Sequence, residues 1–249
     1  MALSPKPYLQ RIELDFGSVP STERYPFSIP AIRELFELSF HPDVTFFVGE
    51  NGSGKSTLLE AIALGLGFGA EGGTRNMRFE TAQTVSPLSH HLKFTKSYKK
   101  PRDYFFLRAE SFYNVATFAD EVGYLEGYGD KSLHARSHGE SFMALLTSKF
   151  KGHGLYLLDE PEAALSPSRQ LAALSAIHQL VEDGSQFIIA THSPILLAYP
   201  NSKIIMFDGS GLTEAAYEDT EHFVVTRDFL NGYRQRVARL LSPDAADHE

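Results

Sequence analysis

Three short apolar runs, at residues 45–48, 155–158 and 187–190, have the length and composition of buried β-strands. Near-continuous apolar runs of this length are typical of strands covered on both faces. Looser alternation predicts further strands at residues 8–16, 37–40, 104–107 and 203–207. Residues 18–30 and 208–211 carry the Pro, Ser, Gly and Asp side chains of loops and turns.

Segments with helical periodicity separate the later strands. Leu58, Leu59, Ile62, Ala63 and Leu66 share one face of a helix predicted at residues 55–66. Two further stripes follow, one of Phe142, Leu145, Leu146 and Phe150, and one of Leu171, Leu174, Ile177 and Val181. Ser166 is a good N-cap for the helix that carries the stripe from Leu171 to Val181, and Pro167 suits the first position of that helix. Residues 221–241 are predicted to form a terminal helix.

Strands that alternate with helices predict an α/β fold with a largely parallel core sheet flanked by helices. An antiparallel β portion is expected near the N-terminus. We expect one domain over residues 1–249, in which residues 74–136 form an inserted polar and partly helical lobe.

Composition narrows the classes of function. The chain has 249 residues, no cysteine and a formal net charge of −8. The missing cysteines exclude disulfides, a thiol nucleophile and thiolate metal ligands, and fit a reducing, cytoplasmic location. The acidic balance gives no support to a mainly electrostatic nucleic-acid binder, although it leaves room for a local basic patch. No apolar run approaches a membrane span, so we expect no transmembrane segment of its own.

The sequence that follows the first apolar run matches the phosphate-binding pattern G-x-x-x-x-G-K-[ST]. Its residues are Gly49, Glu50, Asn51, Gly52, Ser53, Gly54, Lys55, Ser56 and Thr57. Glycines let several backbone N–H groups point at one phosphate chain, and the following helix adds its positive dipole end. Lys55 is expected to reach the β- and γ-phosphates, and the Ser56 hydroxyl to ligate Mg²⁺. The alternative is a glycine-rich turn before an ordinary helix, but the order strand, loop, helix favours the phosphate site.

Two carboxylates, Asp159 and Glu160, follow the apolar run at 155–158. In parallel sheets, ligands bind at the carboxyl ends of strands. Asp159 is therefore expected to hold Mg²⁺, and Glu160 to act as general base on the attacking water. The alternative is a pair of acids that only cap a strand end.

Residues 159–167, Asp-Glu-Pro-Glu-Ala-Ala-Leu-Ser-Pro, resemble the Walker B motif and D-loop of ABC-type ATPases. The similarity is greatest to the soluble, non-transporter branch that includes SMC and RecF-like proteins and small stand-alone AAA ATPases. His192, in Ala-Thr-His-Ser-Pro, matches the switch histidine that senses the γ-phosphate. The resemblance spans most of residues 46–194 and implies hydrolysis of ATP to ADP and phosphate with Mg²⁺.

The resemblance also implies a site completed by a second copy. Ser137, His138, Gly139 and Glu140 stand where the family has its signature, which acts across an ATP-dependent homodimer. His138 replaces a signature glycine and narrows the room for a γ-phosphate. Glu110 replaces the glutamine of the Q-loop, where a carboxylate can still ligate metal. An ordinary Ser/Gly helix N-cap is the alternative interpretation of the signature.

Two further features leave alternatives open. Phe16, Tyr25 and Phe27 are candidates for stacking on adenine, with core packing the favoured role for each. A basic cluster is interleaved with Phe94 and Tyr98. This cluster could contact nucleic acid, but an exposed, solvated hairpin is the favoured interpretation. Its members are His90, His91, Lys93, Lys96, Lys99, Lys100 and Arg102.

The function expected from the sequence is an ATP-driven dimerisation motor or switch for an unknown effector protein. One alternative is the nucleotide-binding subunit of an ABC membrane transporter. Another is a non-hydrolysing ATP switch or DNA-associated module, which the presence of Glu160 disfavours. The stretch between Gly67 and Ser137 is too short for a long coiled-coil arm.

Overall fold

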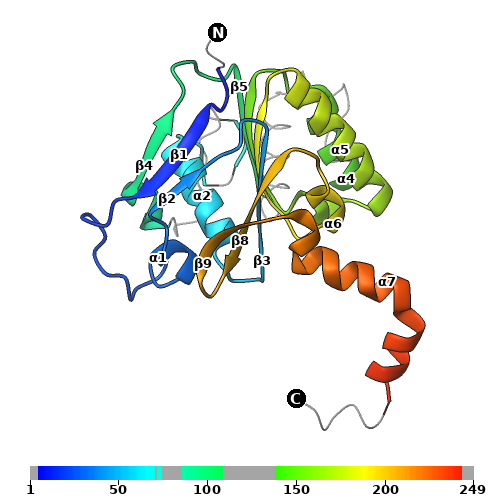
Figure 1. The fold of residues 1–249 in the computed structure, drawn as a ribbon. Coiled ribbons are helices and arrows are strands. Elements are labelled where there is room, and N and C mark those ends of the chain that lie inside the picture. Colours follow the sequence, from blue (N-terminus) through cyan, green and yellow to red (C-terminus); the bar gives the residue numbers. More distant parts are fainter. Residues whose placement is uncertain (1–4, 71, 75–85, 109–137, 243–249) are drawn as a thin grey trace.

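A six-stranded sheet forms the centre of the molecule (Figure 1). The structure is a computed structural model that describes residues 5–70, 72–74, 86–108 and 138–242. In spatial order the strands are β5 (Asp103–Arg108), β6 (Gly154–Asp159), β7 (Gln186–Ala190), β3 (Val44–Gly49), β8 (Ser202–Asp208) and β9 (Gly211–Ala215). The first five are mutually parallel and β9 pairs antiparallel with β8, so the largely parallel sheet is confirmed.

A second, antiparallel sheet covers one side of the molecule. Its order is β2 (Glu37–Ser39), β1 (Leu9–Leu14) and β4 (Leu92–Lys96). Helix α2 (Lys55–Gly65) lies between the two sheets, and it buries more than one stripe because both of its sides are covered. A Cβ added to Gly65 of α2 would overlap the edge of the Phe94 ring of β4, so the glycine permits this close approach.

The pairing of β4 corrects part of the prediction for the basic cluster. Antiparallel structure was expected there, but as an exposed hairpin rather than as a strand of a folded sheet. The short 3₁₀-helix η1 (Pro87–His91) precedes β4, and Leu88 and Leu92 are buried against the core. The short helices α1 (Pro30–Arg33) and α6 (Pro194–Leu197) and the edge strand β9 were not predicted. Of the stretch 74–136, expected as an inserted lobe, the described residues 86–108 contribute β4 and β5 to the two sheets.

Helices cover the opposite face of the central sheet. They are α4 (His138–Ala144), its continuation as a π-helical turn Leu145–Lys149, α5 (Pro167–Glu182) and α6 (Pro194–Leu197). The Ser166 hydroxyl caps α5 by accepting from the Arg169 N–H, as predicted. Leu171, predicted in the apolar stripe of α5, is instead 58% exposed. At about 100° per residue it lies on the far side of the helix from Leu180, which is buried.

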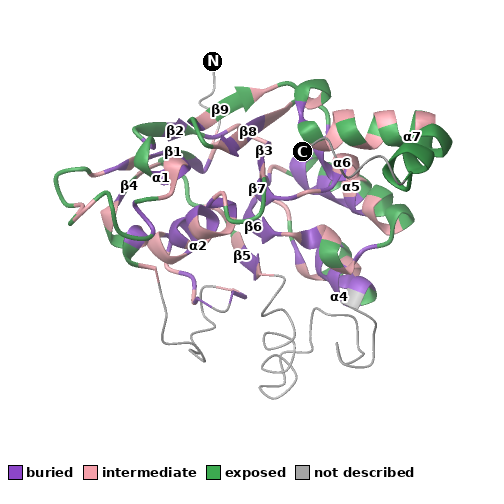
Figure 2. Cartoon of the chain, turned by 90° about the horizontal axis from the view of Figure 1, so that it is seen from below, coloured by how far each residue is buried: buried purple, intermediate pink, exposed green. Residues whose placement is uncertain are grey.

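The last helix, α7 (Glu221–Leu240), leaves the body of the molecule after its first turns (Figure 1). None of its residues is buried, whereas the central strands and α2 are (Figure 2). Apolar side chains still recur along it at every fourth position, at Val225, Phe229, Tyr233 and Val237. Among the helices that the structure describes, none combines the length and apolar character needed to cross a membrane.

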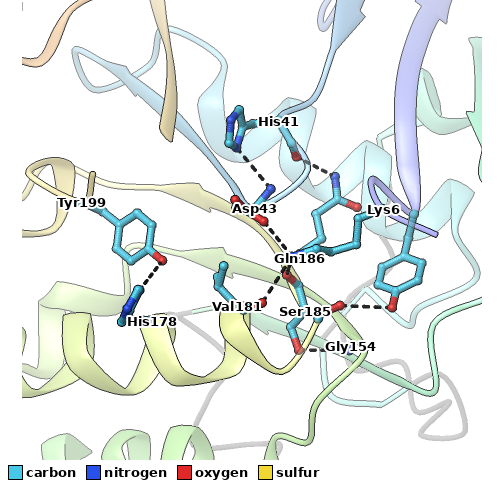
Figure 3. A network of polar contacts seen from close by, with 11 residues as sticks. Lys6, His41, Asp43, Gly154, His178, Val181, Ser185, Gln186 and Tyr199 are labelled. Carbon is cyan, nitrogen blue, oxygen red and sulfur yellow. Dashed lines mark hydrogen bonds and ion pairs between the residues drawn. The ribbon is translucent and has the colours of Figure 1, made fainter. Parts of the chain in front are cut away.

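Polar contacts join the two sheets at the end opposite the phosphate loop (Figure 3). The buried Gln186 amide accepts from the Leu9 N–H at 3.0 Å and donates to the carbonyls of Leu9 and His41 at 2.9 and 3.0 Å. Lys6 adds an ion pair with Asp43 at 2.6 Å. Because β1 and β7 belong to different sheets, this one side chain links the sheets directly.

We predict that Gln186→Leu lowers the free energy of unfolding by about 3 kcal/mol, because it strips partners from buried backbone groups that each cost about 1–3 kcal/mol when unpaired. Urea unfolding followed by circular dichroism measures the change. The matched control Gln179→Leu, at an exposed position of α5, should stay within about 0.5 kcal/mol. Equal stability of the two variants would contradict the linking role of Gln186.

Candidate nucleotide-binding site

The phosphate-binding loop connects β3 to α2, so the predicted order of strand, loop and helix is confirmed. Gly54, the residue before α2, has φ 102° and ψ 4°, a left-handed conformation that glycine adopts at little cost. A Cβ at this position would also lie 2.9 Å from Ile29 Cγ2. A Cβ on Gly49 would overlap the Phe207 carbonyl of the neighbouring strand β8. The loop therefore needs glycine at both positions for its backbone to close.

Lys55 points back along this loop. Its Nζ donates to the carbonyls of Gly49 and Glu50, both at 2.8 Å, and the residue is only 4% exposed. Burial lowers the pKa of the Lys55 ammonium, and the carboxylates of Glu160, Asp159 and Glu162 oppose that shift. A cation is thus held inside the loop that would receive the phosphate chain.

Ser56 and Asp159 meet although 103 positions separate them in the chain. The Ser56 hydroxyl, in the first turn of α2, donates to Asp159 Oδ1 at the end of β6 over 2.9 Å. Hydroxyl and carboxylate oxygens are the ligand types that Mg²⁺ binds in nucleotide sites. The pair predicted to hold the metal is therefore together, and its chemistry fits Mg²⁺.

Glu160 adopts an unusual backbone conformation directly after β6. Its φ and ψ are 47° and 51°, the left-handed region, and its N–H donates to the Ala190 carbonyl at 2.9 Å. For a non-glycine residue this conformation costs of order 1 kcal/mol or more. The side chain faces the next strand's end, where its Oε1 lies 3.6 Å from His192 Nε2. The predicted base and the predicted switch histidine are thus neighbours.

Two residues that the sequence did not single out hold His192. The His192 N–H donates to Glu162 Oε1 at 2.6 Å, and its Nδ1 lies 3.1 Å from His222 Nε2. Burial is the main cause that lowers the pKa of His192, helped by the charge of Lys55 and opposed by Glu160. Burial is also the main cause that raises the pKa of the Glu162 carboxyl, because burial favours the neutral form of each group. Glu162 stood inside the recognised motif without an assigned role, and no motif marks His222.

Two cavities flank the loop. One of about 480 Å³ is lined by residues 49–53, by 206–209 and by Thr220, Glu221 and His222. The other, of about 540 Å³, lies between Glu50, Asn51, His192 and the first turns of α7. Pockets of this size accommodate small-molecule ligands and cofactors.

The signature segment is described in part. Ser137 and Glu110 lie outside the described residues, and His138 begins α4. A Cβ on Gly139 would lie 2.6 Å from the Ala164 carbonyl and 2.6 Å from Arg169 Nη1. Glu140 pairs with Arg169 at 3.4 Å. Gly139 therefore has a packing role within one copy of the chain, where α4 meets the segment after Glu160.

The three aromatic candidates for adenine stacking have separate environments. Phe27 is 2% exposed and belongs to the core, as favoured from the sequence. Phe16 packs on Phe36, with ring centroids 5.1 Å apart. Tyr25 is 67% exposed and its hydroxyl lies 3.3 Å from Thr57 Oγ1, beside the phosphate loop. Tyr25 remains the candidate closest to the site.

The parallel sheet, the glycine-shaped loop and the strand-end carboxylates define a P-loop nucleotide-binding fold. Residues 27–114 match the AAA domain family AAA_23. Together with that match to about a third of the chain, the Asp159–Glu160 pair and His192 support a resemblance to small P-loop proteins of the ABC ATPase type.

Solved structures that this chain matches include CbiO1 from Clostridium perfringens, part of the ABC transporter complex CbiONQ. The match to CbiO1 has 19% identity, covers 91% of this chain and 96% of that chain, and has a TM-score of 0.48. The Smc head bound to the C-terminal winged-helix domain of ScpA has 15% identity, covers 84% and 98%, and also scores 0.48. A putative metal-chelate type ABC transporter has 19% identity, covers 76% and 78%, and scores 0.44. A search of curated proteins finds no match.

We predict that Gly139→Ala lowers the free energy of unfolding by about 1–3 kcal/mol, because the Ala164 carbonyl belongs to the backbone and cannot move aside cheaply. Thermal unfolding provides the measurement. Gly209→Ala is the control, since a Cβ there meets nothing within 4 Å. If both variants unfold at the same temperature as the parent protein, the close packing of α4 on this segment does not constrain residue 139.

Proposed function

We propose that this chain binds ATP with Mg²⁺, hydrolyses it to ADP and phosphate, and uses ATP to pair two copies head to tail for action on an effector protein. The observation that supports the proposal best is the Ser56–Asp159 hydrogen bond of 2.9 Å. It brings the phosphate loop against the strand-end acids, the contact that a metal-assisted phosphoryl transfer requires.

Binding rests on the loop and its lysine. In the proposed complex, Lys55 exchanges the carbonyls of Gly49 and Glu50 for oxygens of the β- and γ-phosphates, and the loop N–H groups surround the chain. Ser56 and Asp159 would hold Mg²⁺, directly or through water. The metal would neutralise charge on the phosphates during transfer.

The hydrolytic step falls to Glu160 and His192. The oxygen of a water attacks the γ-phosphorus, and Glu160 takes a proton from that water. The bond between the γ-phosphorus and the β–γ bridging oxygen breaks, so that ADP leaves with that oxygen. The neutral His192 ring, 3.6 Å from that carboxylate, would donate from Nε2 to a γ-phosphate oxygen. Glu160 and His192 would thus act on the same reacting group.

The number of motifs in one chain supports the pairing of two copies. The chain has one phosphate loop, one pair of strand-end acids and one signature-like stretch, Ser137 to Glu140. In ABC-type ATPases the signature closes the site of the other copy, with the γ-phosphate between them. Gly139 would then serve both the packing of α4 and the surface that meets the second copy.

We predict that Lys55→Ala weakens ATP binding by about 10- to 100-fold, because charge-assisted hydrogen bonds contribute about 1.5–3 kcal/mol. Equilibrium binding and steady-state hydrolysis are measured on the same preparation. Lys99→Ala, in the basic cluster away from the site, should leave both unchanged. Unaltered affinity and turnover in Lys55→Ala would overturn the site assignment.

We predict that Glu160→Gln, which keeps size and loses the base, accumulates as a dimer in Mg-ATP. Light scattering should then give twice the chain mass of 27.7 kDa with ATP and the single mass without it. Ser137→Arg in the same background should abolish the dimer while preserving ATP binding to the monomer.

Either of two results would contradict the pairing model. A Glu160→Gln protein that stays monomeric at high protein and saturating ATP would remove the head-to-tail dimer. A dimer that forms equally well without nucleotide would remove control by ATP.

A further inference from the structure

A second histidine, His222, contacts His192 from the first turn of α7. Its position is fixed by the start of that helix: the buried Thr220 accepts from the Phe223 N–H at 3.3 Å and donates to the Tyr217 carbonyl at 2.7 Å. Tyr217 in turn packs on Phe223 and donates to the Pro194 carbonyl at 2.8 Å. Pro194 lies two residues after His192, so the segments that carry the two histidines are tied together.

The two rings are placed for one hydrogen bond. His222 Nε2 and His192 Nδ1 are 3.1 Å apart, with ring centroids 5.2 Å apart and planes at 46°. The other nitrogen of His192, Nε2, is buried and has no hydrogen-bond partner among the described residues. It faces Glu160, whose Oε1 is 3.6 Å away. The backbone of His192 is held separately by Glu162.

Burial favours the neutral form of both rings. Burial is the main cause that lowers the pKa of each imidazole, and the positive charge of Lys55 lowers both further. The neighbouring His192 also lowers the pKa of His222. Glu160 opposes the shift for His192, and Glu221 and Glu162 oppose it for His222. A neutral imidazole has one N–H and one acceptor nitrogen. In the pair, therefore, one ring must donate and the other must accept.

The surroundings of His192 decide which ring donates. A carboxylate oxygen, such as Oε1 of Glu160, or a phosphate oxygen accepts hydrogen bonds. His192 Nε2 must carry the proton to face them, which leaves Nδ1 as an acceptor. Only a donor at Nδ1 stabilises that tautomer, and His222 Nε2–H is placed to be one. In the reverse arrangement, two lone pairs would face each other across 3.6 Å.

We propose that His222 is a positioning residue: its Nε2–H donates to His192 Nδ1 and so holds His192 as the Nε2–H tautomer aimed at the reacting phosphate. The catalytic consequence rests on the proposed function, whereas the tautomer does not. Partners of this kind fix ring orientation and tautomer for metal-bound and triad histidines. Here the partner comes from α7, 30 positions along the chain.

Nitrogen-15 NMR of the histidine rings tests the tautomer without any turnover. His192→Gln assigns the His192 signals among the ten histidines. The nucleotide-free protein should show His192 with a protonated Nε2 and an unprotonated Nδ1. His222→Phe keeps a ring but removes the donor, so a mixture of tautomers should appear, and His222→Gln, whose amide can donate, should restore the single form. A protonated Nδ1 in the parent protein, or an unchanged tautomer in His222→Phe, overturns the inference.

ATP turnover tests the consequence. His222→Phe should lower kcat about tenfold, as loss of an orienting partner commonly does, with KM changed less than about twofold. His222→Gln should recover most of the rate. His90→Phe, at an exposed site, is the control and should behave as the parent. A purely structural role for His222 would reduce thermal stability and rate together and would not be rescued selectively by a donor side chain.

The two measurements separate this inference from the proposed function. If the parent protein does not hydrolyse ATP, the proposed function fails, and the NMR result still decides whether His222 sets the tautomer. If hydrolysis is present and His222→Phe retains the parental kcat, the positioning role is wrong.

Discussion

The register of three neighbouring parallel strands is the constraint on which the site depends. Phe47 of β3 and Asp159 of β6 both pair with Ala190 of β7, so the three strands reach their carboxyl ends at the same level. The phosphate loop, Glu160 and His192 follow within two residues of that level. A slip of one residue would move one of these groups by about 3.3 Å and turn its side chains to the other face of the sheet.

Burial on both faces maintains that register. Side chains of β3, β6 and β7 alternate between two clusters, one shared with α2 and the antiparallel sheet, and one shared with α4, α5 and α6. Phe46 and Phe47 belong to opposite clusters, for example. A shifted strand would have to exchange side chains between two close-packed interiors, and mismatched packing costs about 1–3 kcal/mol for each overpacked position. The positions of the site residues are thus determined by the core and not only by local loop contacts.

Much of this arrangement was predictable from the sequence because its signals are local. The apolar runs, the spacing of Lys55 and Ser56 behind Gly49, and the acids directly after a strand each occupy fewer than about a dozen residues. What the sequence did not reveal depends on pairing between distant segments. The prediction of an exposed hairpin at β4 is wrong because the alternation of Leu92 and Phe94 is too short to reveal the pairing with β1 that buries Leu92. Leu171 was misplaced because the small residues Ala173 and Ala176 form the buried side of α5. His222 is visible only once α7 is folded beside His192.

The two ends of the central sheet differ in whether their buried polar side-chain atoms have hydrogen-bond partners. Among the described residues, the buried side-chain atoms without a hydrogen-bond partner are Ser53 Oγ, Glu162 Oε2 and His192 Nε2. All three belong to segments at the carboxyl ends of β3, β6 and β7, whereas the polar joint at the other end, around Gln186, is paired on both its oxygen and its nitrogen. Each such buried group costs about 1–3 kcal/mol, and the left-handed Glu160 adds backbone strain at the same edge. The fold therefore concentrates its energetic cost where phosphate chemistry is proposed, and a ligand that supplied partners there would gain affinity from groups already held in place.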